Sequence, residues 1–242
     1  MQNETITIPI LAGMIDHSLL HPTFTKTDIL KGLEISKNTK VATACVKPCD
    51  TGLAAEVLRN SETKVCAVVS FPHGNSTTKI KIAECRQCIS EGAAEIDIVC
   101  NIGKVLSGDW QAVENEISQV NAVVVEEGAI LKVIFENDYL ENEHIIQLTR
   151  ICSDIGVAFV KTSTGYGFVK QPDGSYNYRG ATDEHLSLMV KHARPGTQVK
   201  AAGGIRTLDD LLRVRALGIS RVGATATVSI LEEAKKRFPE QP

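Results

Sequence analysis

The sequence predicts an α/β protein folded as a single-domain (β/α)8 TIM barrel over residues 1–242. Short apolar, β-rich runs alternate eight times with longer amphipathic segments, at roughly 30 residues per repeat. No Pro- or Gly-rich linker interrupts this alternation, and 242 residues is a length that one α/β barrel commonly reaches. These observations together favour one continuous barrel.

Apolar runs locate the strands, and apolar residues at helical spacing locate the helices between them. Ile29, Leu30, Leu33 and Ile35, for example, recur at the spacing of one helix face. The expected strands are residues 12–18, 42–46, 65–70, 95–100, 130–136, 157–162, 198–202 and 221–223. The expected helices are residues 27–38, 52–59, 79–91, 109–127, 143–155, 183–192 and 208–217, with a last helix from about residue 229.

A doubly wound open sheet would show the same alternation of strands and helices. We favour a closed barrel because polar residues at strand ends occur all along the chain and do not gather at one crevice. Residues 165–181 are rich in Gly, Tyr, Asn, Asp and Pro, so we expect a long irregular loop after the sixth strand. That loop lies on the face where barrels carry their active sites.

The composition excludes several classes of protein. With 26 Lys and Arg against 29 Asp and Glu, the net charge of −3 argues against a nucleic-acid partner. No uncharged apolar run approaches the roughly 18 residues of a membrane span, and residues 1–10 lack the basic start of a signal peptide. Seven cysteines, an odd number, indicate free thiols in a reducing compartment. We therefore expect a cytoplasmic protein without a membrane partner.

Four charged residues interrupt strands that should be almost continuously apolar, namely Asp97, Lys132, Lys161 and Lys200. They belong to expected strands four to seven, which are consecutive neighbours around a barrel. Burying an unpaired ion costs several kcal/mol, so one acid among three bases indicates a mutually compensating cluster. An ion-pair network that only maintains strand register is the structural alternative.

Clustered lysines also suggest a chemistry. A neighbouring ammonium group and partial desolvation both disfavour the charged form, so we expect one strand lysine to have a lowered pKa. A neutral amine is nucleophilic and forms a Schiff base with a carbonyl substrate, which arginine cannot do. This reasoning leaves both Lys161 and Lys200 open as the nucleophile.

Two glycine-containing loops follow the last two expected strands. Gly203 and Gly204 leave the seventh strand, and Gly223, Ala224 and Thr225 leave the eighth. Loops at these two positions of a barrel frequently bind phosphate through backbone N–H groups. The presence of both glycine-containing loops predicts a phosphorylated ligand.

The cysteines suggest less. Cys85 and Cys88 lie within an expected helix and lack a second pair at zinc spacing, so we expect buried thiols and no metal. Cys45 and Cys49 lie near the second strand, from which they could approach the pocket.

Several motifs together resemble the deoxyribose-phosphate aldolase family over nearly the whole chain. The Lys-Thr-Ser-Thr-Gly of the sixth strand and the Lys-Ala-Ala-Gly-Gly of the seventh are the most specific. The resemblance rests on residues 15–22, 70–74, 77–79, 92–103, 160–165 and 199–207.

The resemblance implies a class I aldolase, a lyase without metal or cofactor, of deoxyribose phosphate catabolism. It would reversibly cleave 2-deoxy-D-ribose 5-phosphate to acetaldehyde and D-glyceraldehyde 3-phosphate. Lys161 matches the Schiff-base lysine, Lys200 the second lysine that lowers its pKa, and Asp97 the acid/base residue. Lys132 and Asp16 match supporting polar residues. Residues expected to bind phosphate or substrate are Gly165, Gly203, Gly204, Gly223, Ala224 and Thr225.

Two departures keep alternatives open: Thr225-Ala226 replaces the usual Ser-Ser, and residues 166–179 form a longer stretch than usual. One alternative is an aldolase of the same chemistry acting on another aldehyde or phosphosugar. Others are a non-catalytic sugar-phosphate-binding barrel and a phosphate-dependent isomerase or flavin barrel. Barrels of this length often form homodimers, and the sequence leaves a monomer and a homodimer open.

Overall fold

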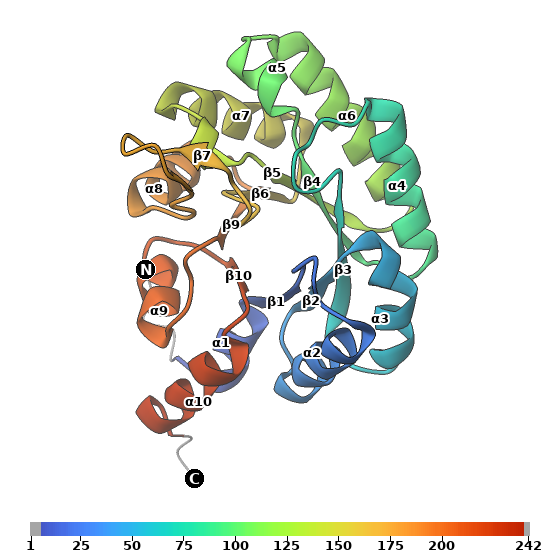
Figure 1. Cartoon of the computed structure of the whole chain (residues 1–242), viewed down its shortest axis with the longest axis vertical. Helices are drawn as coiled ribbons and strands as arrows, with labels where there is room; N and C mark the ends of the chain where they lie inside the picture. Colours follow the sequence, from blue (N-terminus) through green and yellow to red (C-terminus); the bar gives the residue numbers. More distant parts are fainter. Residues whose placement is uncertain (1–5, 240–242) are drawn as a thin grey trace.

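The computed structural model describes residues 6–239, in which eight parallel strands close into a barrel surrounded by helices (Figure 1). The order around the barrel is β1-β10-β9-β6-β5-β4-β3-β2. Closure is made by β1 and β10, where Ile15 pairs with Val222. The predicted fold class is therefore confirmed, and an open sheet is excluded. Residues 1–5 and 240–242 of the predicted domain lie outside the described residues.

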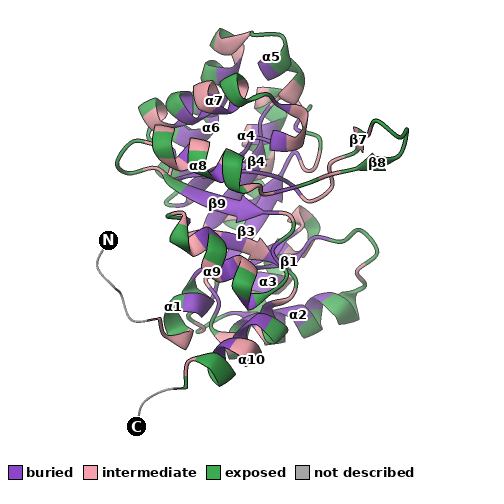
Figure 2. Cartoon of the chain, turned by 90° about the vertical axis from the view of Figure 1, so that its left-hand side faces the viewer, coloured by how far each residue is buried: buried purple, intermediate pink, exposed green. Residues whose placement is uncertain are grey.

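The strands form on short, β-rich runs that are mostly apolar, and both faces of nearly every barrel strand are buried (Figure 2). The barrel strands are β1 (Ile15–Leu19), β2 (Thr43–Val46), β3 (Lys64–Val69), β4 (Glu95–Val99), β5 (Ile130–Ile134), β6 (Phe159–Lys161), β9 (Gln198–Ala202) and β10 (Arg221–Ala224).

Several helices begin at polar caps that the sequence carries. Thr25 with Asp28 and Thr207 with Asp210 form reciprocal capping boxes at the starts of α2 and α9. The helices are α1 (Ile8–Gly13), α2 (Lys26–Thr39), α3 (Thr51–Val57), α4 (Thr78–Ser90), α5 (Ile102–Leu106), α6 (Trp110–Glu126), α7 (Asn142–Ile155), α8 (Asp183–His192), α9 (Leu208–Ala216) and α10 (Thr227–Arg237), with 3-10 turns η1 (Pro48–Asp50) and η2 (Asn137–Tyr139).

The predicted first strand, residues 12–18, starts too early. Residues 8–13 form α1, which packs against α10 (Figure 1). The side chain of Thr7 accepts a hydrogen bond from the Ile10 N–H, and Pro9 is tolerated in the first helical turn. Periodicity over so short an apolar run does not distinguish helix from strand.

Four other predicted strands continue too far, namely residues 65–70, 95–100, 130–136 and 157–162. Ser70 and Glu136 have φ values of 51° and 59°, so β3 and β5 end before them. A left-handed backbone cannot continue a strand, and it turns the chain at the mouth of the barrel. The short helix α5 also escaped prediction, because it is only 5 residues long.

The segment predicted as an irregular loop contains a small antiparallel hairpin, β7 (Val169–Lys170) and β8 (Tyr176–Asn177). It projects from the barrel as an exposed arm (Figure 2). Phe168 and Tyr176 stack at its base with ring centroids 4.1 Å apart. The Pro172-Asp173-Gly174 turn was the available signal for a hairpin.

Strand register brings the charged residues to neighbouring positions. Asp97 pairs with Lys132 across β4 and β5, and Lys161 pairs with Lys200 across β6 and β9. Alternation places Glu95 on the same face of β4 as Asp97. Among the described residues, no helix combines the length and apolar content needed to cross a membrane.

Candidate active site

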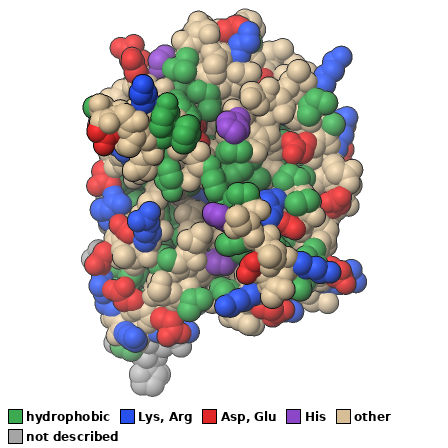
Figure 3. All heavy atoms as spheres, viewed as in Figure 1, with side chains coloured by type: hydrophobic (Ala, Val, Ile, Leu, Met, Phe, Trp, Pro, Cys, Tyr) green, Lys and Arg blue, Asp and Glu red, His purple; other side chains and the backbone are tan. Residues whose placement is uncertain are grey.

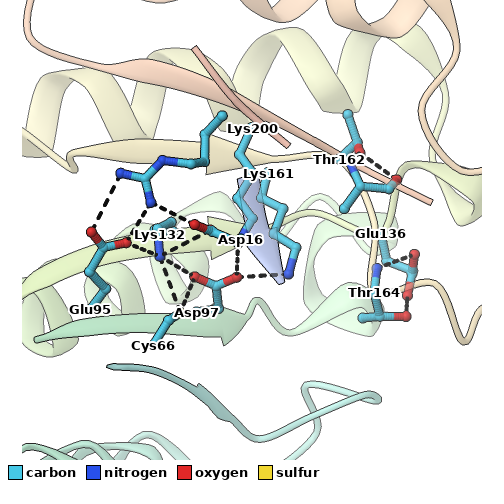
Figure 4. Close-up of polar contacts among 12 residues, drawn as sticks. Asp16, Cys66, Glu95, Asp97, Lys132, Glu136, Lys161, Thr162, Thr164 and Lys200 are labelled. Carbon is cyan, nitrogen blue, oxygen red and sulfur yellow. Dashed lines mark hydrogen bonds and ion pairs between the residues drawn. The ribbon is translucent and has the colours of Figure 1, made fainter. Parts of the chain in front are cut away.

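Asp97 is the centre of a buried charge cluster inside the barrel (Figure 4). Its Oδ2 accepts hydrogen bonds of 2.7 Å from the Nζ atoms of both Lys161 and Lys200. Its Oδ1 accepts one of 2.7 Å from Lys132. The structure therefore brings together the acid and the three lysines that interrupt the strand pattern.

Three further charged residues complete the cluster. Asp16 lies 2.5 Å from Lys200 Nζ as an ion pair, and Glu95 lies 2.6 Å from Lys132 Nζ. Arg221 joins them, with hydrogen bonds of 2.7 Å to Asp16 and 3.0 Å to Glu95. The cluster is therefore larger than the predicted one acid and three bases, because Asp16 and Glu95 add two acids and Arg221 adds a base.

The cluster formed by Asp16, Glu95, Asp97, Lys132, Lys161, Lys200 and Arg221 contains three carboxyl groups and four basic groups. With every group ionised, it carries one excess positive charge. A single neutral amine would balance it, which reduces the cost of burying the whole set.

The carboxylates keep two of the lysines charged. Burial alone would lower the pKa of Lys200, but Asp16 and Asp97 raise it above its usual range. Burial is likewise outweighed at Lys132, whose pKa is raised by Asp97, Asp16 and Glu95 among its neighbours. Neither Lys132 nor Lys200 is therefore the one strand lysine expected to have a lowered pKa, because additional acids surround both.

The same attraction keeps the acids ionised. Burial favours protonated Asp97, yet Lys132, Lys161 and Lys200 hold its pKa well below the usual range. The pKa of Asp16 is also lowered, because Lys200, Lys132 and Arg221 outweigh burial. Both side chains are therefore acceptor-only carboxylates at neutral pH.

Lys161 and Lys200 differ in how many anions hold them. Lys161 has one carboxylate within contact distance, Asp97, whereas Lys200 touches both Asp97 and Asp16. Loss of the proton from Lys161 would therefore remove one ion pair, whereas loss of the proton from Lys200 would remove two. Lys161 is therefore the pocket lysine with fewer anionic partners, a difference that the residue pattern alone did not reveal.

A cavity of about 440 Å³ opens above the cluster, and both Lys161 and Lys200 line it. Figure 3 shows that, on the viewed face, charged side chains occupy mainly the periphery, while histidine and apolar side chains gather nearer the middle. All six residues predicted to bind phosphate or substrate line the cavity: Gly165, Gly203, Gly204, Gly223, Ala224 and Thr225.

The cavity also contains residues that the sequence reasoning did not select. Arg206 lines the cavity with Gly203 and Gly204, and it belongs to residues 199–207, one of the stretches that carry the family resemblance. Tyr166 and Tyr178 enter from the loop after β6. Their contact with the pocket could not be foreseen, because it depends on how that loop folds back.

The loop after β6 is anchored to the end of β5. Asp138 accepts hydrogen bonds from the backbone N–H groups of Arg179 at 2.6 Å and Gly180 at 2.9 Å. Glu136 accepts from the N–H of Thr164 at 3.1 Å and from its hydroxyl group. Burial raises the pKa of Glu136. These contacts hold the pocket side of the loop in place.

The cysteines divide by location. Cys45 lines the cavity as anticipated, whereas Cys49 is exposed and is absent from its wall. Cys85 and Cys88 are buried on α4, and burial raises their thiol pKa values to about 12 and about 11. Neutral thiols of this kind pack as small apolar groups.

Comparison with known proteins agrees with the geometry. The model of the family described as DeoC/LacD family aldolase matches residues 11–227. A deoxyribose-phosphate aldolase of Rhodopirellula baltica is 46% identical over 228 residues, covering 94% of this chain and 90% of that protein. A deoxyribose-phosphate aldolase of Treponema denticola is 41% identical over 217 residues, covering 90% and 96% respectively.

A solved structure supports the same relationship. The tetrameric deoxyribose phosphate aldolase from Aeropyrum pernix superposes with a TM-score of 0.84 at 27% identity. The superposition covers 96% of this chain and 93% of that one. The similarity therefore extends through the whole barrel.

Proposed function

The chain belongs to the DeoC/LacD family of aldolases, and we propose that it reversibly cleaves 2-deoxy-D-ribose 5-phosphate through a Schiff base on Lys161. The products are acetaldehyde and D-glyceraldehyde 3-phosphate. The observation that carries this proposal is the arrangement of Lys161 beside Lys200 on one oxygen of Asp97, at the floor of a pocket with glycine loops at its rim.

Lys161 acts as the nucleophile because its amine faces the pocket and has a single carboxylate partner. Lys200 remains an ammonium group, since Asp16 and Asp97 hold its proton. Its positive charge disfavours a second charge on Lys161. The neutral amine adds to the substrate carbonyl, and loss of water leaves an iminium group that withdraws electrons.

Cleavage follows from that electron withdrawal. Removal of the proton from the C3 hydroxyl breaks the C2–C3 bond, and the bonding electrons pass to the iminium group to form an enamine. Protonation of the enamine carbon and hydrolysis release acetaldehyde and the free amine. Asp97 is suited to proton transfer between the two lysines because its Oδ2 contacts both Nζ atoms at 2.7 Å.

The other end of the pocket suits the substrate phosphate. Gly203, Gly204 and Gly223 allow close approach of backbone N–H groups, and Arg206 provides a positive charge. Lys132 lies deeper, where it supports the charge cluster, whereas Asp16 lines the cavity beside Lys200 and forms an ion pair with it. We therefore propose that the reacting carbonyl binds at the lysines and the phosphate at the glycine loops.

Borohydride trapping followed by peptide mass mapping tests the nucleophile. Incubation with deoxyribose 5-phosphate and reduction should leave an adduct on Lys161. An adduct on Lys200 would reverse the two roles, and the absence of any adduct on either lysine would contradict the Schiff-base mechanism.

A second candidate is an aldolase of the same chemistry with a different aldehyde or phosphosugar substrate. Thr225-Ala226 supports it, because Ala226 offers no hydroxyl, and the tyrosine-bearing loop after β6 changes the pocket wall. Comparing kcat/KM for deoxyribose 5-phosphate and deoxyribose separates the candidates. Equal values would contradict a phosphate-binding role for the glycine loops.

We place this reaction in the cytoplasm and in the catabolism of deoxyribose phosphate. All seven cysteines are free, which suits a reducing compartment. We also propose a homo-oligomer, supported by the tetrameric relative from Aeropyrum pernix. Light scattering in solution tests the assembly, and a monomer at high protein concentration would contradict it.

A further inference from the structure

Two thiols and a carboxylate meet inside the barrel beneath the pocket. Cys45 on β2 and Cys66 on β3 are paired in register, so both side chains share one level of the barrel. Their Sγ atoms and a carboxylate oxygen of Asp97 all lie within 4.8 Å of one another. The Cys66 Sγ is 3.1 Å from Asp97 Oδ1.

This spacing fits three ligands of one tetrahedral ion. Zn–S bonds of about 2.3 Å and Zn–O bonds of about 2.0 Å place such ligand atoms about 3.5 Å apart. Small rotations of buried side chains would bring all three atoms to that separation. Thiolate sulfur also selects soft cations over Mg²⁺ and Ca²⁺.

The three candidate ligands, Cys45, Cys66 and Asp97, are accessible from the pocket. Cys45 lines the cavity, whereas Cys66 and Asp97 lie beneath it. An ion that enters the pocket therefore meets the Cys45 sulfur first and keeps one coordination position open toward the cavity. Three protein ligands with an open fourth position is a common arrangement for zinc.

The site already accommodates positive charge. Lys132 Nζ lies 3.2 Å from Cys66 Sγ and 2.7 Å from Asp97 Oδ1. When a metal ion takes these two atoms, Lys132 retains Glu95 at 2.6 Å. Two thiol protons leave as the cation enters, so the net charge of the buried cluster is unchanged.

We propose that Cys45, Cys66 and Asp97 form an inhibitory binding site for one thiophilic divalent cation of the Zn²⁺ and Cd²⁺ type. The ion binds both sulfurs as thiolates and takes an oxygen of Asp97. It thereby draws negative charge away from the Oδ2 that Lys161 and Lys200 share, and it obstructs the pocket floor. The inhibition rests on the function proposed above for Asp97, whereas the binding itself does not.

A cadmium titration of the full chain tests the site, with binding and activity measured in parallel. The ultraviolet charge-transfer band of cadmium thiolates should grow to one ion per chain with two sulfur ligands. Cleavage activity should fall over the same range and return when EDTA removes the ion. Mg²⁺ at the same concentrations should have no effect.

Cys66→Ser and Cys45→Ser test the ligands, and Cys49→Ser, which changes the exposed thiol, is the matched control. Each variant is compared with its own activity before cadmium is added. Since loss of even an outer partner of a metal ligand costs about 10- to 100-fold in affinity, half-inhibition in Cys66→Ser should need at least about tenfold more cadmium. Cys49→Ser should match the unchanged chain.

Alkylation of the unchanged chain provides a test that needs no variant. Bound cadmium should protect Cys45 from iodoacetamide and leave Cys49 reactive, as mapped by mass spectrometry. Protection of Cys49 alone, or a charge-transfer band that survives Cys66→Ser, would overturn the proposed site. A normal band without loss of activity would retain the binding site and contradict both inhibition and the role proposed for Asp97.

Discussion

The two carboxylate oxygens of Asp97 contact all three lysines of the charge cluster. The Nζ atoms of the three lysines contact Asp97 at 2.7 Å, and it is fully buried. Removing its charge leaves the lysines facing one another in a medium that solvates them poorly. The residue therefore supports both the fold and the proposed proton transfer.

Asp97→Asn should reduce both activity and stability. We expect kcat to fall about 10²- to 10⁴-fold, the usual contribution of a positioned acid/base group. The free energy of unfolding should fall by about 3–5 kcal/mol, as when one partner of a buried ion pair is removed. Steady-state kinetics and urea denaturation measure the two effects.

Glu95→Gln is the matched control for that prediction, because Glu95 contacts Lys132 and Arg221 but neither lysine at the pocket. It should lose stability in a similar way and retain much more of its kcat. Equal losses of kcat in the two variants would show that Asp97 acts only through the stability of the cluster.

His17 makes folding depend on pH. Burial lowers its pKa from 6.5 to about 4, and its Nδ1 lies 2.8 Å from the Thr227 hydroxyl oxygen. The unfolded chain binds the proton first on acidification, so His17 contributes full stability above pH 6.5 and progressively less toward pH 4. A shift of this size corresponds to about 3 kcal/mol at most.

Urea denaturation between pH 4 and pH 7 tests this linkage. His17→Asn should flatten the dependence of unfolding free energy on pH across that window. His73 is exposed, so His73→Asn is the control. This variant should retain the original dependence of unfolding free energy on pH. An unchanged slope in His17→Asn would assign the acid sensitivity to other groups.

Among the elements, the loop after β6 decides the shape of the pocket. Its far end forms the exposed β7–β8 hairpin, while its near end places Tyr166 and Tyr178 at the cavity. Gly180 packs directly on the backbone of Gly203 in the loop after β9. A contact between two loop backbones thus links the tyrosines to the proposed phosphate site.

Gly180→Ala should separate those loops. The new Cβ would stand 2.6 Å from the Gly203 carbonyl oxygen, at a φ of 74° that disfavours alanine. We expect kcat/KM for the phosphorylated substrate to fall by about tenfold or more, since ångström-scale misplacement costs up to about a hundredfold. Steady-state kinetics with phosphorylated and unphosphorylated deoxyribose measure the effect.

Gly174→Ala provides the control because Gly174 has a similar φ of 85° but open space around its Cβ position. It should incur only backbone strain of about 1–2 kcal/mol and retain its kinetics. An equal loss of kcat/KM in Gly180→Ala and Gly174→Ala would show that backbone strain in the loop, and not contact with Gly203, determines the shape of the pocket.

For the molecule as a whole, a second buried ion pair joins the outer helices to the barrel. Lys81 on α4 donates hydrogen bonds of 2.7 Å to Glu116 on α6 and 2.8 Å to the Val99 carbonyl oxygen at the end of β4. One ammonium group therefore connects two helices with the strand that carries Asp97. It lies outside the pocket, so its role is structural.

Lys81→Met should destabilise the barrel by about 3–5 kcal/mol, because Glu116 is left as a buried, unpaired charge. The double variant Lys81→Met with Glu116→Leu should recover much of that loss, since an apolar pair needs no desolvation of ions. Urea denaturation of both variants measures this. A double variant no more stable than the single one would show that the Val99 hydrogen bond carries the energy.

The sequence by itself determined the barrel and the centre of its chemistry. Alternating apolar runs and capped helices are local patterns, so they predicted eight strand–helix units with errors mainly at element ends. Asp97, Lys132, Lys161 and Lys200 were recognisable because each interrupts an apolar strand with a charge. A buried charge is costly enough to be visible without knowledge of its partner.

Only the tertiary structure decided which partners each charge has. Arg221 reaches Asp16 across 205 residues of sequence and Glu95 across 126, and these contacts depend on barrel closure and strand register. The balance of carboxylates then distinguishes Lys161 from Lys200, and the folded loop adds Tyr178 to the pocket. Pairing between distant side chains is a property of three-dimensional packing, and local sequence patterns carry no record of it.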